Sequence, residues 1–235
     1  MKIIILAPAA MLLAISTQAC LPLPEPSGNG RQAQQKIFTI GAEGGISIAS
    51  LSFEDKNIND AYESRTGYAA GVALQYNFKK VFSLRTGAVF ERKGTKTELT
   101  FTDTSANIIG TGELKINLGY LSIPLLLRAT FGNKINFFVQ GGPYWAALLT
   151  ARQELETEAP NITVEPDIKY AYESSEFGVS GGIGAAALFN EMILLSVEVR
   201  NNLGITDIRH ASYEVKTRSL LFLAGVALTF GSRKE

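Results

Sequence analysis

The sequence is poor in the residues that build metal centres, disulfide frameworks and charge-driven nucleic-acid surfaces. It has one cysteine and one histidine among 235 residues, which excludes an intramolecular disulfide scaffold, a cysteine-rich zinc site and most histidine-based metal sites. Its 22 basic and 22 acidic residues give a formal net charge of zero, so bulk positive charge does not drive nucleic-acid binding. Hydrophobic residues make up 46% of the chain, which argues against a disordered polymer. A β-rich or mixed globular chain and a membrane β-barrel both fit this composition.

The first 19 residues have the parts of a secretory signal. Lys2 precedes an apolar run over residues 3–15, and small residues lead to Ala19. The run is shorter than the about 20 residues that a spanning helix needs. We therefore predict a signal peptide at 1–19, a periplasmic linker rich in proline and glycine at 20–35, and one barrel domain at 36–235. Cys20 is either simply the first mature residue or a lipid attachment site, although Thr17 stands where a lipoprotein signal usually has an aliphatic residue.

Between residues 36 and 230 apolar and polar side chains alternate with the period of two that is typical of β-strands. Tight turns at 79–80, 132–134 and 190–191 alternate with long loops at about 49–66, 94–111, 153–173 and 205–217. This asymmetry is typical of outer-membrane barrels. We predict an all-β fold, an eight-stranded antiparallel up-and-down transmembrane β-barrel, integral to the cell outer membrane with both termini periplasmic. The strands are expected at about 36–48, 67–78, 81–93, 112–131, 135–152, 174–189, 192–204 and 218–230.

The two faces of these strands differ in chemistry. In the last segment Leu220, Phe222 and Leu228 share one bulky apolar face, whereas the opposite faces of other segments carry small and polar residues. Because an eight-stranded barrel has a narrow interior, we place the bulky face toward lipid and the polar face inward. Six inward charges then balance as three acids and three bases. These six residues are Glu43, Arg85, Glu91, Arg128, Glu198 and Arg200. They form either a packed ionic plug, which the narrow lumen favours, or a proton or solute path.

Aromatic residues and strand parity add detail to this prediction. Phenylalanines 38, 78, 82, 131, 137, 189 and 230 fall at the short-turn ends of the strands and predict one interfacial girdle, with Tyr68, Trp145 and Phe177 in the other. In the fourth segment the apolar parity changes, which predicts a bulge near Gly119-Tyr120. Pro124 predicts a second local irregularity, because proline lacks a ladder donor.

The stretch Gly119-Tyr120-Leu121-Ser122-Ile123-Pro124-Leu125-Leu126-Leu127-Arg128 resembles the "YLEIPLLLK" signature of the PorT-like outer-membrane β-barrel domain family. The glycine-rich pieces at 141–144 and 177–184 resemble the strands that follow it. The resemblance covers about residues 36–230, although Ser122 replaces the usual acidic residue. It implies an outer-membrane barrel, and the family has no single activity and no catalytic residues to carry over to this chain. Some members are linked to protein secretion, and Phe230 resembles the terminal aromatic read by the barrel-assembly machinery.

Enzymatic and metal chemistry have weak signals. His210 and Ser212, with Asp207 and Glu214 nearby, form a His-x-Ser pair that resembles the active site of outer-membrane lipid A deacylases, but it lies in a predicted loop and lacks the surrounding residues of those enzymes. The loop at 153–173 holds six acids and one base. It is either a solvated acidic surface or a place where calcium or magnesium bridges to lipopolysaccharide phosphates.

The sequence thus predicts an outer-membrane barrel with a plugged polar lumen that acts through its extracellular loops as an envelope-structural or binding protein. The expected partners are outer-membrane lipid and lipopolysaccharide, the barrel-assembly machinery during insertion, and an unknown protein bound by the loops; nucleic acid and cofactors are not expected. An accessory role in protein secretion or small-solute transport is the alternative. A lipid A-modifying enzyme is a further alternative.

Overall fold

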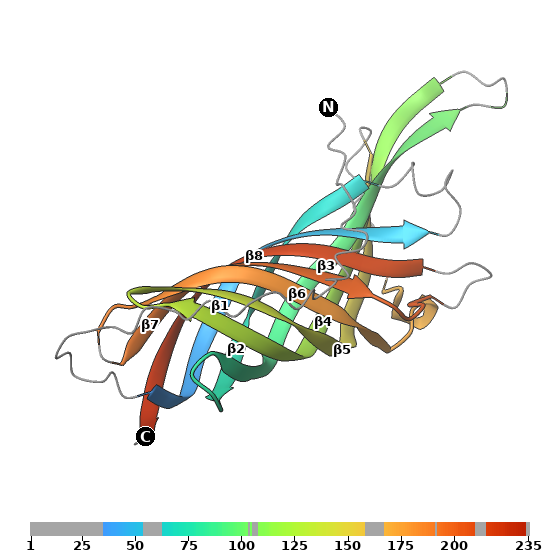
Figure 1. Cartoon of the computed structure of the whole chain (residues 1–235). Coiled ribbons are helices and arrows are strands. Elements are labelled where there is room, and N and C mark those ends of the chain that lie inside the picture. Colours follow the sequence, from blue (N-terminus) through green and yellow to red (C-terminus); the bar gives the residue numbers. More distant parts are fainter. Residues whose placement is uncertain are drawn as a thin grey trace, which may run out of the picture. The chain divides into compact units, whose positions relative to one another are not determined.

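The computed structural model describes residues 35–53, 63–102, 104, 108–157, 167–190, 192–209 and 215–233. Within these residues the chain forms eight strands that pair in chain order, and the first strand also pairs with the last (Figure 1). All neighbours are antiparallel, so the sheet closes into an up-and-down barrel. No helix among the described residues is long and apolar enough to cross a bilayer. The predicted signal peptide, Cys20 and residues 20–34 of the predicted linker lie outside the described residues.

The eight predicted strands are confirmed, but several are longer than expected. The strands are β1 (Gln35–Phe53), β2 (Glu63–Asn77), β3 (Phe82–Thr102), β4 (Ile108–Gly132), β5 (Ile135–Thr157), β6 (Ser175–Leu188), β7 (Ile193–Gly204) and β8 (Val215–Arg233). A short 3-10 turn, η1 (Lys169–Ala171), precedes β6. The prediction of a loop at 94–111 was wrong, because β3 and β4 continue as a paired hairpin as far as Thr102 and Ile108, with a register shift after Phe101. The charged residues of this segment are typical of a loop, yet their side chains lie on one face of the sheet.

The side chains face as predicted along most of the wall. Phe222 and Leu228 are 41% and 49% exposed on the outer surface, whereas Glu198 and Arg200 are buried inside. Leu220 has the same parity as Phe222 and is half-buried. The lumen is less uniformly polar than expected, since Leu221 and Leu223 also point inward and pack with Ala69 and Val89.

The aromatic residues also lie on the outer surface. Six of the seven phenylalanines assigned to the short-turn end are exposed, and Phe78 is half-buried. Phe38 stacks against Phe230 across the β1–β8 closure, with ring centroids 6.1 Å apart. Tyr68, Trp145 and Phe177 are exposed nearer the other end. At the turn after β4, Gly132 has a φ of +114°, a conformation that side chains disfavour.

The irregularity predicted near Gly119-Tyr120 is present, but it does not cause the parity change in β4. A register shift does occur at Gly119/Tyr120, but only in the β4–β5 pairing, where Leu149 of β5 is the extra residue. The β3–β4 register continues without a shift through this point. Leu114, Ile116 and Leu118 therefore stay on the inner face, and the outer face changes from apolar to charged. At Pro124 the β3–β4 pairing is interrupted without a change in register.

Candidate functional site

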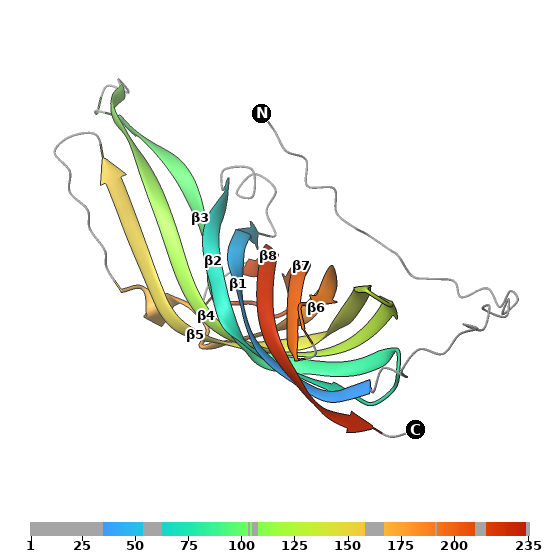
Figure 2. The same cartoon turned by 90° about the vertical axis from the view of Figure 1, so that its left-hand side faces the viewer.

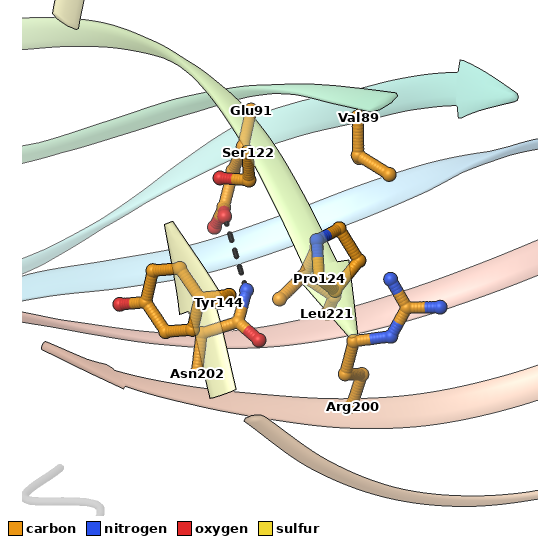
Figure 3. A pocket seen from close by; sticks show the side chains of 8 residues that line it. All are labelled: Val89, Glu91, Ser122, Pro124, Tyr144, Arg200, Asn202 and Leu221. Atoms are coloured by element: carbon orange, nitrogen blue, oxygen red, sulfur yellow. Dashed lines mark hydrogen bonds between the residues drawn. The ribbon is translucent and has the colours of Figure 1, made fainter. Parts of the chain in front are cut away.

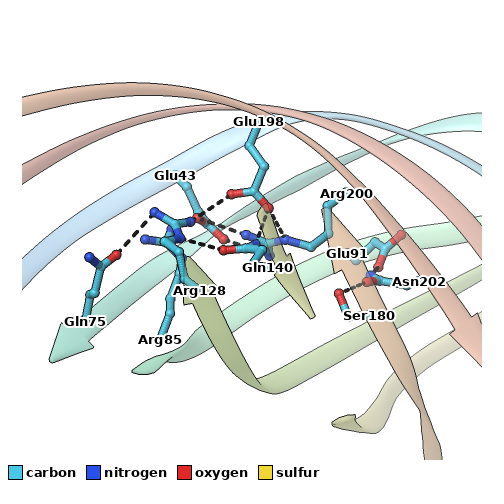
Figure 4. A network of polar contacts seen from close by, with 10 residues as sticks. All are labelled: Glu43, Gln75, Arg85, Glu91, Arg128, Gln140, Ser180, Glu198, Arg200 and Asn202. Atoms are coloured by element: carbon cyan, nitrogen blue, oxygen red, sulfur yellow. Dashed lines mark hydrogen bonds and ion pairs between the residues drawn. The ribbon is translucent and has the colours of Figure 1, made fainter. Parts of the chain in front are cut away.

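A network of polar side chains crosses the lumen in the half of the barrel that ends in short turns (Figure 4). We call it the turn-side network. Arg200 Nε donates a hydrogen bond to Glu198 Oε1 at 2.6 Å, and Arg200 Nη1 lies 3.1 Å from Glu43 Oε1. Arg85 pairs with the other oxygen of Glu43. The network consists of Glu43, Gln75, Arg85, Arg128, Gln140, Glu198 and Arg200.

Arg128 joins the two sides of this network. Its Nε donates to Gln140 Oε1 at 2.8 Å, and its Nη2 lies 3.4 Å from Glu198 Oε2. The guanidinium carbon also lies 3.7 Å from the centre of the Phe138 ring, a cation–π geometry. Buried charges are tolerated only with good partners and additional hydrogen bonds, and these side chains supply both. The network is therefore a packed ionic layer.

Glu91 lies apart from this network, although the sequence grouped it with the other five charged residues. It forms no ion pair with a described residue. Ser47 Oγ donates to Glu91 Oε1 at 2.7 Å, and Asn202 Nδ2 donates to Glu91 Oε2 at 3.3 Å. Asn202 in turn accepts a hydrogen bond from Ser180. The turn-side network thus holds three guanidinium groups against two carboxylates, and the third predicted carboxylate lies in a separate layer.

A second buried ion pair, which sequence reasoning missed, lies nearer the long connections. Lys93 Nζ is 2.9 Å from Glu176 Oε1, and the two side chains are 1% and 0% exposed. Thr217 and Tyr144 donate to the same carboxylate oxygen. The ammonium also lies 5.0 Å and 5.3 Å from the ring centres of Tyr120 and Tyr144. We call Lys93 and Glu176 the loop-side pair.

The sequence did contain a signal for this pair. Lys93 has the same parity as Arg85 and Glu91 in β3, and Glu176 has the same parity as Ser180 in β6. The predicted strands end at residue 93 and begin at residue 174. At the end of a strand, alternation does not establish whether a side chain points into the lumen. Only the barrel closure shows that two strands distant in the sequence bring them together.

Beyond the loop-side pair the lumen is closed by apolar side chains. Tyr172 and Ile208, which belong to the connections flanking β6 and β7, are buried against residues of the strands. A bridge between Tyr172 and Arg209 ties these two connections to each other. The connections thus fold partly into the barrel mouth. The apolar cluster also contains Leu51, Ile116, Leu118, Leu148 and Val215.

A small cavity touches both polar layers of the lumen (Figure 3). Arg200 of the turn-side network and Tyr144, which contacts the loop-side pair, both line it. The space that the centre of a water molecule can occupy is about 10 Å³. The cavity therefore interrupts the packing but does not form a channel. Its lining residues are Val89, Glu91, Ser122, Pro124, Tyr144, Arg200, Asn202 and Leu221.

The hairpin of β3 and β4, together with the end of β5, extends beyond the other strands (Figure 2). We call this part the projecting sheet. β2 pairs with β3 no further than Lys96, whereas β3 continues to pair with β4 as far as Thr102. Its outer face carries ion pairs, with Lys96 Nζ 3.4 Å from Glu63 and 3.8 Å from Glu113. Near its base, Arg65 and Arg92 lie 3.7 Å and 3.5 Å from Glu154.

The other predicted candidates fall largely outside the described residues. His210, Ser212 and Glu214 lie there, as do residues 158–166 of the acidic loop. Asp207 accepts hydrogen bonds from the backbone N–H groups of Arg209 and Val215, so its carboxylate stabilises the connection before β8. Glu154 forms ion pairs with Arg65 and Arg92 at the base of the projecting sheet. Among the described residues, no group of three or more His, Cys, Asp or Glu side chains is placed to hold a metal ion.

Comparison with known proteins agrees with this architecture. A family model described as "Outer membrane protein beta-barrel domain" matches residues 32–209. The chain belongs to this outer-membrane β-barrel family. It is accordingly an integral outer-membrane protein, and its wall of exposed Leu, Val, Ile and Phe side chains meets lipid. No curated protein matches the sequence.

Several solved structures resemble this family member. Neisserial surface protein A is 14% identical, with a TM-score of 0.46, and the match covers 82% of this chain and 97% of that one. OprG from Pseudomonas aeruginosa is 12% identical, with a TM-score of 0.46 and coverages of 85% and 99%. Ail of Yersinia pestis, solved with the heparin analogue sucrose octasulfate, is 11% identical, with a TM-score of 0.38 and coverages of 81% and 99%.

Proposed function

We propose that this outer-membrane barrel is an envelope-structural or binding protein that acts through the end carrying its long connections. The observation that carries the proposal is the closed lumen. The turn-side network, the loop-side pair and the apolar cluster occupy successive levels, and the cavity between the polar layers is about the size of one water molecule. An eight-stranded barrel packed in this way favours recognition at a surface over passage of a solute.

The projecting sheet is the surface that we assign to partner binding. It rises above the neighbouring strands and presents a charged outer face, with ion pairs between Lys96, Glu63 and Glu113. We infer that it faces the cell exterior, where an unknown protein partner binds it, while both termini and the short turns face the periplasm. Support comes from the pairing of Gln35 with Arg233, which brings the first and last strand ends to the short-turn side, and from the predicted signal peptide.

A hairpin deletion tests this proposal. Lys96 and Lys115 are directly paired, so an Asn-Gly turn that joins them removes residues 97–114 and preserves the register below. The matched control replaces Asn133-Lys134, at the opposite end, with Asn-Gly. Neighbours are crosslinked in intact outer membrane, co-purified and identified by mass spectrometry. We expect a partner that the wild type and the control capture and the hairpin variant loses. Identical neighbours for all three proteins would contradict the proposal.

The inferred orientation has its own test. An epitope tag inserted at position 104, between β3 and β4, should bind antibody on intact cells. A tag in the turn at 133–134 should bind only after the outer membrane is permeabilised. The reverse pattern would refute the orientation while leaving the barrel fold unaffected.

A secretion or solute-transport accessory remains the second candidate, because the PorT-like resemblance of residues 119–128 favours it. In the barrel Tyr120 and Ser122 of that stretch point inward and Ile123 points to lipid. Planar-bilayer recordings without discrete steps would exclude a pore, and normal secretion after gene deletion would exclude the accessory role. The lipid A-modifying reading is tested by His210→Ala and Ser212→Ala; we expect an unchanged lipid A profile.

The remaining proposed partners follow from the surface of the barrel. Its exposed apolar wall suits contact with the acyl chains of outer-membrane lipid and lipopolysaccharide. Phe230, 47% exposed near the end of β8, is the residue that we propose the barrel-assembly machinery reads during insertion. We propose no nucleic-acid partner, because the net charge is zero.

A further inference from the structure

We propose that the cavity between the turn-side network and the loop-side pair is an internal binding site for one water molecule, which couples the charge of Glu91 to that of the turn-side network. The side chains that line the cavity, drawn in Figure 3, are all buried. The size of the cavity limits which ligand it can hold. A space of about 10 Å³ for the centre of the ligand is close to the minimum that holds a single water, and is too small for a sugar, lipid or amino acid.

The lining is polar enough to hold a water. Ser122 is 5% exposed, and its Oγ has no hydrogen-bond partner among the residues that the structure describes. Glu91 and Asn202 line the same space. From the side chains that the structure describes, Glu91 accepts two hydrogen bonds, one from Ser47 and one from Asn202, although a carboxylate can accept about four. Because empty cavities in proteins are apolar and polar ones hold water bound to about 2–4 groups, this cavity should be hydrated.

Charge favours water over a cation. The turn-side network contains three guanidinium groups and two carboxylates, so it carries one excess positive charge. Glu91 carries one negative charge and has no described ion-pair partner. Both Glu91 and Arg200 line the cavity, which makes the lining neutral. A sodium or potassium ion would add an uncompensated charge in a low-dielectric lumen, whereas a neutral dipole can orient between the two groups.

A water in the cavity would connect Glu91 to the turn-side network, although the two lie in separate layers. Without such a bridge, Glu91 and the excess arginine charge are separated by a gap in a medium that screens poorly. A bound water can donate to Glu91 or Ser122 and accept from a neighbouring donor. The three acids and three bases then balance as one assembly, although Glu91 does not contact an arginine directly.

A structure of the full barrel tests the site directly. We expect, at high resolution, one water peak in the cavity within hydrogen-bond distance of Ser122 Oγ and either Glu91 or Arg200. Crystals grown with rubidium in place of sodium should show no anomalous peak there. A cavity without density, or a rubidium peak in it, would overturn the proposal.

Two variants give an independent test through stability. Ser122→Val fills the cavity beside Val89 and Leu221, and Ser122→Ala removes the hydroxyl while leaving the space. If a water bridges charges in the cavity, Ser122→Val should lower the urea midpoint of unfolding in lipid vesicles more than Ser122→Ala does. If the cavity is dry, filling it should raise the midpoint, and that result would refute the proposal.

Discussion

The loop-side pair provides the sharpest test of the closed lumen. Lys93→Met removes the ammonium and keeps a side chain of similar length, so Glu176 is left charged at 0% exposure. Loss of one partner from a buried ion pair costs about 3–5 kcal/mol in the free energy of unfolding. Adding Glu176→Gln removes the stranded charge and still offers an oxygen to Tyr144 and Thr217. We expect the double variant to recover about 2–3 kcal/mol of the loss.

The matched control is Lys96→Met, three residues further along β3. Lys96 is 35% exposed, and its partners Glu63 and Glu113 are 69% and 33% exposed. Such surface pairs contribute about 0–1 kcal/mol. The free energies are measured by urea unfolding in phospholipid vesicles, with the fluorescence of Trp145, the single tryptophan, as the signal. Two results would refute the reasoning. Either Lys93→Met lowers the free energy of unfolding no more than Lys96→Met, or the effects of the changes at 93 and 176 simply add; in both cases the loop-side pair does not stabilise the closed lumen.

The lipid-facing wall and the turns give further predictions. Val197 is 60% exposed on β7, and Val197→Arg should destabilise the barrel by about 2–4 kcal/mol in vesicles. The control Thr100→Arg, on the outer face of the projecting sheet, should be nearly neutral. Equal effects of the two changes would show that Val197 does not face hydrocarbon. Gly132→Ala should lower stability by at least about 1–2 kcal/mol, because its Cβ would lie 2.2 Å from Ile135 O. Gly231→Ala, with 3.4 Å to Ile37 Cβ, should cost less in the same urea titration, and the opposite order would contradict this account of the β4–β5 turn.

The projecting sheet shows how an alternating pattern can be misread. Residues 96, 98, 113 and 115 are charged, and such residues are unusual in the lipid-facing part of a barrel. Above the level of Gly119, however, the outer face of β3 and β4 pairs charged groups with each other, and the inner face packs Ile116 and Leu118 against Tyr172 and Ile208. The composition of each face therefore reverses along β3 and β4 without a change in the register between these two strands, because the surroundings of the strands change from hydrocarbon to water.

The number of strands, their antiparallel order and the direction of the bulky side chains were determined by the sequence alone, because a period of two fixes which residues share a face. The same period placed Glu43, Arg85, Arg128, Glu198 and Arg200 inside. Which of these charges meet was decided only by closure of the barrel. Closure joins strands far apart in the chain, and it separated Glu91 from the arginines, paired Lys93 with Glu176 across 83 residues, and left the small cavity between the two layers. Alternation carries no information about distances across a lumen, since these depend on the tilt and stagger of all eight strands together.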